Sequence, residues 1–179
     1  MAPHQQSRGA VKVHTLLDLR GSIPTFIHIT HGRVHDVLML DHIAFEPGAF
    51  YVLDRGYLHF RRLFRLHQSG AFFVTRALCT TRMKRVSSRR VSKATGLRSD
   101  QTVRLSGVHT QREYTATLRR ITFCDPETGK RFIFLTNNFL LPALTIAQLY
   151  KSRWTIEVFF KWIKQPSDQE LSRQFTKCN

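Results

Sequence analysis

The sequence predicts an α/β protein in which a layered α/β domain is interrupted late by a basic, mainly β segment. Three observations lead to this fold class. Short apolar runs bounded by turn residues recur along the chain, as strands do. Two stretches carry apolar residues at helical spacing. The stretch 76–104 follows neither pattern, and it holds nine lysines and arginines but a single acid, Asp100.

The first half of the chain predicts a hairpin, two helices and two buried strands. Alternating residues on both sides of Gly21-Ser22 are typical of a hairpin. Asp36 is placed to cap a short helix, and leucines mixed with arginines predict an amphipathic helix further on. In chain order, we expect strands at 10–20 and 23–30, a helix at 36–43, a strand at 49–53, a helix at 57–68 and a strand at 71–75.

The second half predicts β structure followed by one long helix. The basic stretch has weak helical periodicity and is interpreted as a loop within a mainly β insertion. Asp125 to Gly129 has the composition of a hairpin turn. β-like runs lie near 101–105, 114–124 and 131–136, and Pro142 precedes a helix over about 143–164.

Charge is the strongest compositional indication of function. The 179 residues carry 28 lysines and arginines against 12 acids, a formal net charge of +16. Such an excess favours a polyanionic partner, through counterion release from phosphates. No apolar run is long enough for a membrane span, and the N-terminus lacks an apolar signal core, so we expect a cytoplasmic, bacterial-type protein. The three cysteines show no metal-binding spacing.

One constellation on the long helix carries chemistry. Tyr150, Arg153, Glu157 and Lys164 fall within an arc of roughly 60° on a helix, so one acid lies on a stripe of aromatic and basic residues. The alternative is an ordinary surface helix in which Arg153 and Glu157 form an i,i+4 ion pair.

The spacing Tyr150-x2-Arg153-x3-Glu157-x6-Lys164 resembles the signature of DDE transposases from bacterial insertion sequences. The resemblance extends over residues 9 to 165, including the segments "EPGAFYVLDRGYLHFRRL", "GAFFVTRA" and "LYKSRWTIEVFFKWIK". It implies an RNase H-like fold and two Mg²⁺ ions held by three carboxylates, which cut DNA and join it to a target. Magnesium prefers such oxygen ligands, and paired metals suit phosphodiester attack.

The resemblance assigns roles residue by residue. Asp54, in "VLDRGY", matches the second catalytic and metal-binding acid, and Glu157 matches the third. Taken alone, Asp54 could equally cap a helix or a turn. The residues that match DNA-contacting positions are Tyr150, Arg153, Lys164 and, leading into the insertion, Arg76. DNA is the implied partner, with a homodimer acting on paired transposon ends in the bacterial nucleoid.

The match is incomplete at both ends. The family's first acid lies on a first strand ahead of "GAVKVHTLL", but residues 1–8 contain no acid, and Pro166 stops the long helix. We therefore expect an inactive remnant without the first strand. The alternatives are a non-enzymatic DNA-binding remnant, which could regulate an intact transposase, and a basic RNA-binding protein. The expected divisions are 9–76 and 131–165 for the RNase H-like domain, 77–130 for the insertion, and 166–179 for a divergent tail.

Overall fold

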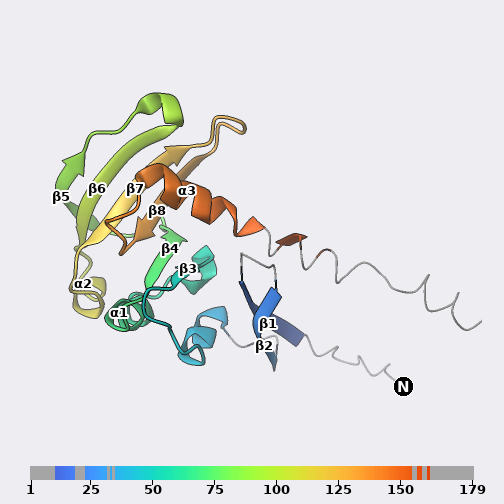
Figure 1. The fold of residues 1–179 in the computed structure, drawn as a ribbon. Coiled ribbons are helices and arrows are strands. Elements are labelled where there is room, and N and C mark those ends of the chain that lie inside the picture. The colour runs from blue at the N-terminus through green and yellow to red at the C-terminus, as the bar shows by residue number, and fades with distance from the viewer. Residues whose placement is uncertain are drawn as a thin grey trace, which may run out of the picture.

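A six-stranded mixed sheet forms the centre of the protein in a computed structural model (Figure 1). The structure describes residues 11–18, 23–31, 33, 35–154, 157, 158 and 161. The strand order is β3-β4-β8-β7-β6-β5, in which β3 and β4 are parallel and all other neighbours antiparallel. The mixed α/β fold class is thus confirmed. The strands are β3 (Phe50–Val52), β4 (Phe72–Arg76), β5 (Met83–Arg89), β6 (Leu97–Leu105), β7 (Leu118–Cys124) and β8 (Arg131–Thr136).

Two helices cover opposite faces of this sheet. Alternate residues of a strand point to opposite faces, so neighbouring residues enter different cores. Phe73 of β4 joins the core beneath α1 (Phe60–Gln68), and the adjacent Val74 joins the core beneath α3 (Ala143–Lys151). The result is a three-layer α/β/α arrangement, which requires strands that are apolar on both sides.

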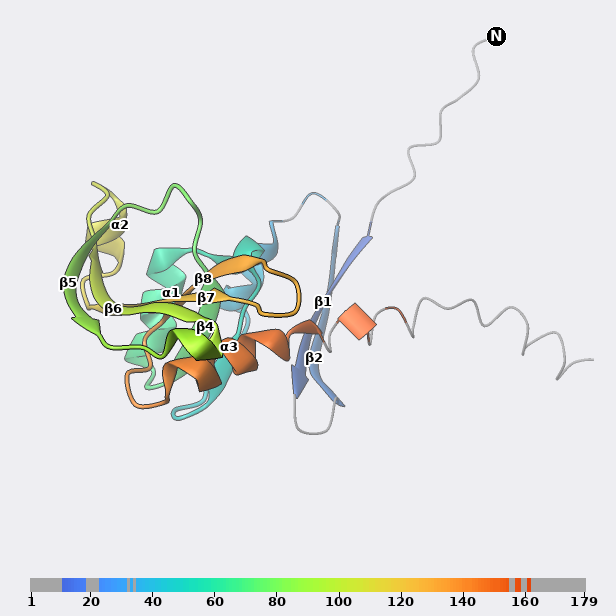
Figure 2. The same cartoon turned by 90° about the horizontal axis from the view of Figure 1, so that it is seen from above.

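The predicted hairpin is confirmed and forms a sheet of its own. Strands β1 (Val11–Asp18) and β2 (Ile23–His31) pair antiparallel, with Val11 opposite His31. Figure 2 shows this hairpin beside the six-stranded sheet. Its strands exchange no hydrogen bonds with the larger sheet within the described residues.

The basic stretch differs from its prediction as a loop. Residues Met83–Arg89 form β5, which pairs with β6 and is the outermost strand of the sheet. Six of its seven residues are exposed, so neither face shows the apolar alternation by which a strand is recognised. The short helical element η3 (Lys93–Thr95) lies between β5 and β6, and α2 (Thr110–Glu113) lies between β6 and β7. The second of these ends before Tyr114, where the sequence predicts a strand.

The first predicted helix is a 3₁₀ helix, η1 (Asp36–Asp41). Asp36 does not cap it, because the N-cap position belongs to His35 and no side-chain cap bond forms. A second 3₁₀ turn, η2 (Arg55–Tyr57), takes the start of the second predicted helix, so that α1 begins only at Phe60.

The continuous helix α3 is also shorter than the helix predicted over 143–164. Helix α3 ends at Lys151, a turn follows at 152–153, and 154, 157, 158 and 161 are helical among the described residues beyond it. Within the described part of the chain, no helix is long and apolar enough to cross a bilayer.

A buried ion pair connects the basic segment to the loop that precedes α3. Arg119 of β7 donates from Nε and Nη2 to the two carboxylate oxygens of Asp100, at 2.9 and 2.8 Å. Its Nη1 donates to the carbonyl oxygens of Asn138 and Leu141, at 3.3 and 2.6 Å. This one guanidinium therefore fixes the loop from which α3 begins.

Candidate functional site

Asp54 lies where the parallel pair β3–β4 ends. The backbone N–H of Leu53 still bonds to the carbonyl of Val74, at 2.9 Å, and the chain then turns into η2. The carboxylate of Asp54 makes no cap bond to that turn, although Asp54 is its N-cap residue. Its side chain is 51% exposed, so the strand end presents a carboxylate to solvent.

Tyr150 brings α3 to this carboxylate. Its ring is buried against Phe134, with the two ring centroids 4.9 Å apart. Its hydroxyl donates to Oδ1 of Asp54 over 3.4 Å, across 96 residues of sequence. Burial, and then the charge of Asp54, raise the pKa of the Tyr150 hydroxyl, so it acts as a neutral donor.

Arg153 lies between the two acids that the sequence singles out. Its Nε is 3.8 Å from Oδ1 of Asp54, and its Nη2 donates to Oε1 of Glu157 over 2.6 Å. The guanidinium also lies 5.8 Å from the ring centroid of Tyr150. Burial disfavours the charge, but the bond to Glu157 and the charge of Asp54 outweigh burial and raise the pKa of Arg153. Asp54, Tyr150, Arg153 and Glu157 therefore form one connected group, which we call the Asp54–Glu157 site.

The i,i+4 ion pair considered for Arg153 and Glu157 is present, but it is part of a larger arrangement. The side chain of Arg153 is only 22% exposed, whereas an ordinary surface arginine extends into water. Nε of Arg153 is buried and lacks a hydrogen-bond partner among the described residues. Its attraction to Asp54 is consequently electrostatic rather than a hydrogen bond.

Asp54 and Glu157 are the right kind of ligand for Mg²⁺, which prefers carboxylate oxygens. As they lie, however, both pair with the guanidinium of Arg153. In the described part of the chain, no three His, Cys, Asp or Glu side chains are grouped closely enough to hold a metal ion. The arrangement is therefore an ion-pair network and does not fit a three-carboxylate metal centre.

Arg76 lies at the end of β4, close to the same helix. Its guanidinium lies 5.1 Å from the ring centroid of Phe132, and its positive charge acts to lower the pKa of Tyr150. It is thus near Tyr150, while no hydrogen bond or ion pair to the two acids is found among the described contacts. Lys164 lies outside the described residues.

Asp36 lies near this site, although its sequence context suggests only a helix cap. Its carboxylate is near Gly56, since a Cβ built there would lie 3.8 Å from Oδ2 of Asp36. Burial first, and then the charges of Asp36 and Asp54, raise the pKa of the Tyr57 hydroxyl. This proximity results from η1 packing on η2, which no local sequence pattern indicates.

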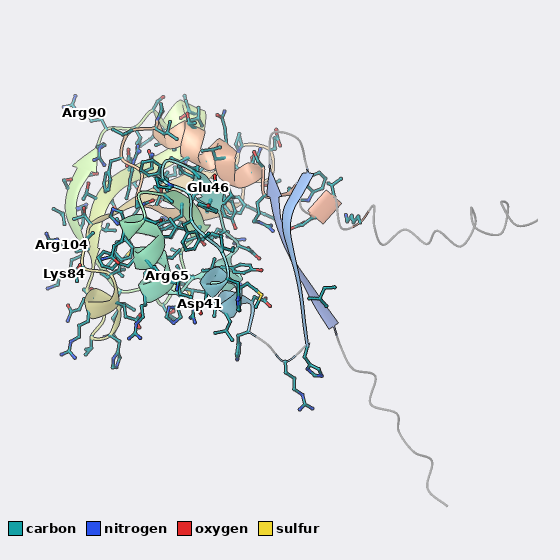
Figure 3. The ribbon with its side chains drawn as sticks, turned by 60° about the horizontal axis from the view of Figure 1, so that its bottom comes forward. Asp41, Glu46, Arg65, Lys84, Arg90 and Arg104 are labelled. Atoms are coloured by element: carbon teal, nitrogen blue, oxygen red, sulfur yellow. The ribbon has the colours of Figure 1, made fainter. Side chains whose placement is uncertain are left out.

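Basic side chains cover the outer part of the sheet. Lys84 of β5 and Arg104 of β6 are cross-strand neighbours, and both are exposed (Figure 3). Like charges directly opposite one another are destabilising unless an anion or solvent screens them. Asp100, on the same strand as Arg104, is buried and paired with Arg119, so its negative charge is already compensated and does not offset the positive charges of Lys84 and Arg104. The other exposed basic residues of β5, β6 and the turn between them are Arg85, Arg89, Arg90, Lys93 and Arg98.

Comparison with known proteins gives a consistent result. Residues 1–175 match the model of the family described as "Transposase DDE domain". A protein of Sinorhizobium fredii named as the transposase y4zB is 37% identical over 159 residues, which are 87% of this chain and 44% of that protein. A protein of Geobacillus stearothermophilus named as a transposase for insertion sequence element IS5377 is 29% identical over 166 residues, or 92% of this chain and 43% of that protein.

The chain thus spans less than half the length of either of these relatives. The match nevertheless includes both segments that build the Asp54–Glu157 site, the chain after β3 and the segment from Tyr150 of α3 to Glu157. The family also accounts for the mixed sheet with helices on its two faces. The chain belongs to the DDE transposase family of insertion sequence elements.

Proposed function

We propose that the chain acts in DNA transposition, as a DNA-binding part of an insertion sequence transposase. The observation that carries this proposal is the Asp54–Glu157 site. A strand end and a helix region 96 residues apart supply an acid, a tyrosine and an arginine that meet at one place, where the carboxylate of Asp54 reaches solvent. In the family, such acids belong to Mg²⁺-dependent cleavage and transfer of DNA strands at transposon ends. The proposed place of action is the bacterial nucleoid, and a homodimer on paired ends is part of the proposal.

The charge distribution supports DNA as the partner. Lys84 and Arg104 are adjacent and exposed, and they gain favourable partners if a phosphate backbone lies across β5 and β6. Tyr150 is proposed to contact DNA as well, but its buried ring leaves only the hydroxyl for this purpose. The side chain of Arg153 is 22% exposed, and its guanidinium can exchange a carboxylate for a phosphate.

A second candidate function is a DNA-binding protein that is not an enzyme and regulates an intact transposase. The pairing of both acids with Arg153 favours it, because a guanidinium takes up the negative charge that a divalent cation would need. We propose accordingly that these 179 residues, on their own, bind DNA without cutting it. The whole transposase is proposed to cut and join strands.

The two candidates are separated with a supercoiled plasmid that carries the ends of the insertion sequence. The purified chain is incubated with this plasmid and Mg²⁺, and nicking is followed on a gel. We expect binding and no nicking above background. Nicking at the ends that is lost in Asp54→Asn and kept in Glu127→Gln, an exposed acid of the β7–β8 turn, would contradict the non-enzymatic candidate. Failure to bind either plasmid or end fragments would contradict both.

A further inference from the structure

A basic cavity lies where η1 approaches the first turns of α1. It has a volume of about 240 Å³ and is lined by Asp41, His59, Arg61, Arg62 and Arg65. We propose that this cavity, called the α1 pocket below, binds a phosphate group of the DNA backbone. The inference rests on the proposed function for DNA as the partner, but it concerns a site separate from the Asp54–Glu157 site.

Asp41 holds two of the arginines in fixed positions. Its Oδ2 accepts from Nε and Nη2 of Arg62, at 2.9 and 2.6 Å, and its Oδ1 lies 3.0 Å from Nη2 of Arg65. That same Nη2 donates to the carbonyl of Leu40 over 2.6 Å. Figure 3 shows Asp41 and Arg65 side by side, from η1 and α1. Each guanidinium keeps further N–H donors for a ligand, since it has five in all.

The charge of the α1 pocket is positive after these pairings. Three arginines and one carboxylate line the pocket, so these four groups give an excess of two positive charges. Hydrogen bonds from Arg62, and then the charges of Arg62 and Arg65, outweigh burial and lower the pKa of Asp41, which keeps it ionised. The carboxylate thus orients the arginines without cancelling their charge.

Two lining groups have no partner among the described residues. Nδ1 of His59 is buried and makes no hydrogen bond. Arg61 is exposed, and none of the contacts found in the described residues involves its guanidinium. A buried polar atom without a partner is costly, so a phosphate oxygen that accepts from the Nδ1–H tautomer of His59, or a bridging water, is expected at Nδ1. The first turn of α1 contains no acid that would repel an anion.

The size and place of the α1 pocket fit a backbone phosphate. Its volume is far above the roughly 10–15 Å³ that one water molecule needs, so a tetrahedral anion can enter. His59 follows Asp54 by five residues, with only η2 and Leu58 between them, and η1 packs on η2. A DNA strand that passes Asp54 therefore has the α1 pocket close by to hold one of its phosphates.

The first experiment uses inorganic phosphate as the probe. Thermal unfolding of the 179-residue chain is measured with phosphate or chloride at matched ionic strength and pH. We expect phosphate in tenfold excess over its Kd to raise Tm by about 2–5 °C, and Arg61→Gln to lose this rise. The matched control is Arg131→Gln, an exposed arginine at the start of β8, which should keep it. An unchanged rise in Arg61→Gln would overturn the proposal.

The second experiment measures binding of a labelled DNA duplex by fluorescence anisotropy. We expect Arg61→Gln to weaken binding about 5–10-fold and to reduce the salt slope by about one, with less than a twofold effect of Arg131→Gln. Equal effects of the two variants on DNA binding would overturn the assignment to backbone phosphate, even if Arg61→Gln abolishes phosphate binding. His59→Gln provides a second variant and should weaken phosphate binding in the same direction.

These arms also keep the inference distinct from the proposed function. If the natural chain binds inorganic phosphate at Arg61 but binds no DNA, the proposed function fails, and so does the backbone-phosphate assignment. If the chain binds DNA and the Arg61→Gln variant binds it equally well, only the α1 pocket assignment fails. Arg61 and Arg131 are both exposed, so Arg61→Gln and Arg131→Gln should leave the circular dichroism of the chain unchanged in the absence of phosphate.

Discussion

Replacing Arg119 with methionine should destabilise the protein more than any other single arginine change in the sheet. The side chains of Arg119 and Asp100 are only 4% and 5% exposed. The substitution removes two hydrogen bonds from Asp100 and two from the carbonyls of the loop before α3. Breaking a buried ion pair by removing one partner costs about 3–5 kcal/mol, because the other charge stays buried.

The structure lowers this figure slightly. Arg89 lies 3.5 Å from the same carboxylate and is 42% exposed, so it can compensate by up to about 1 kcal/mol. We therefore expect a loss of about 3 kcal/mol in the free energy of unfolding. With a urea m-value of about 2 kcal/mol/M, the midpoint should fall by about 1.5 M. Urea unfolding followed by circular dichroism measures this shift directly.

The neighbouring residue provides the control. Arg120 is half-buried, and its Nη1 donates to Oε1 of Gln101, at 3.0 Å. Arg120→Met should cost about 1 kcal/mol. Adding Asp100→Leu to Arg119→Met should recover part of the loss, since no unpaired charge remains. Equal midpoints for the Arg119→Met and Arg120→Met variants would refute the reasoning.

Three further predictions concern a turn, a histidine and the site. Gly96 has φ +85°, and a Cβ there would lie 2.5 Å from a backbone oxygen, so Gly96→Ala should lower the free energy of unfolding in urea by about 2–4 kcal/mol. Gly48 has φ +79° but open space around it, so Gly48→Ala should cost only about 1 kcal/mol. Equal costs for the two variants would contradict the steric explanation. Burial lowers the pKa of His67 in the folded protein, so the unfolded chain binds the proton first as pH falls. The stability that neutral His67 contributes is full above about pH 6.5 and decreases below it. His67→Asn should show a weaker decrease in stability at low pH, and a pH profile identical to that of the natural chain would count against this. Arg153→Gln should strengthen Mn²⁺ binding about 2–10-fold in electron paramagnetic resonance titrations, because the guanidinium no longer competes with the cation for Asp54 and Glu157. Unchanged or weaker binding would argue against that competition.

The interior elements could be predicted from the sequence because their patterns are strong. Short apolar runs predict β4 and β8, and the middle of β4 and the second half of β8 are buried between the two helical layers. The hairpin of β1 and β2 follows from alternation with a central turn. The order of strands could not be predicted, because β8 lies between β4 and β7 through pairings distant in sequence.

Exposed strands and polar contacts escaped prediction for a common reason. Strand β5 owes its conformation to pairing with β6 and not to an apolar face of its own. The sequence predicts a strand at Tyr114, but this residue is buried beside α1, where its hydroxyl bonds to Nδ1 of His67 over 2.8 Å. Burial raises the pKa of Tyr114. Such partners are chosen by tertiary packing, which a single local pattern does not contain.

For the Asp54–Glu157 site, the sequence indicated the residues but not their arrangement. The spacing of Tyr150, Arg153 and Glu157 predicts a shared helix face, and the structure brings Asp54 to the same place. That Tyr150 is buried, and that Arg153 pairs with both acids, depends on contacts across 96 residues. The catalytic, metal-binding and DNA-contacting roles of these residues stay predictions.

Binding to the ends of the insertion sequence tests the central claim most directly. Anisotropy of a labelled end duplex and of a shuffled duplex is measured with the 179-residue chain over a range of salt concentrations. We predict tighter binding to the end duplex, with log K falling linearly and steeply as log salt rises, because lysines and arginines displace counterions from phosphates. No measurable binding to either duplex at low salt would contradict a role in DNA transposition.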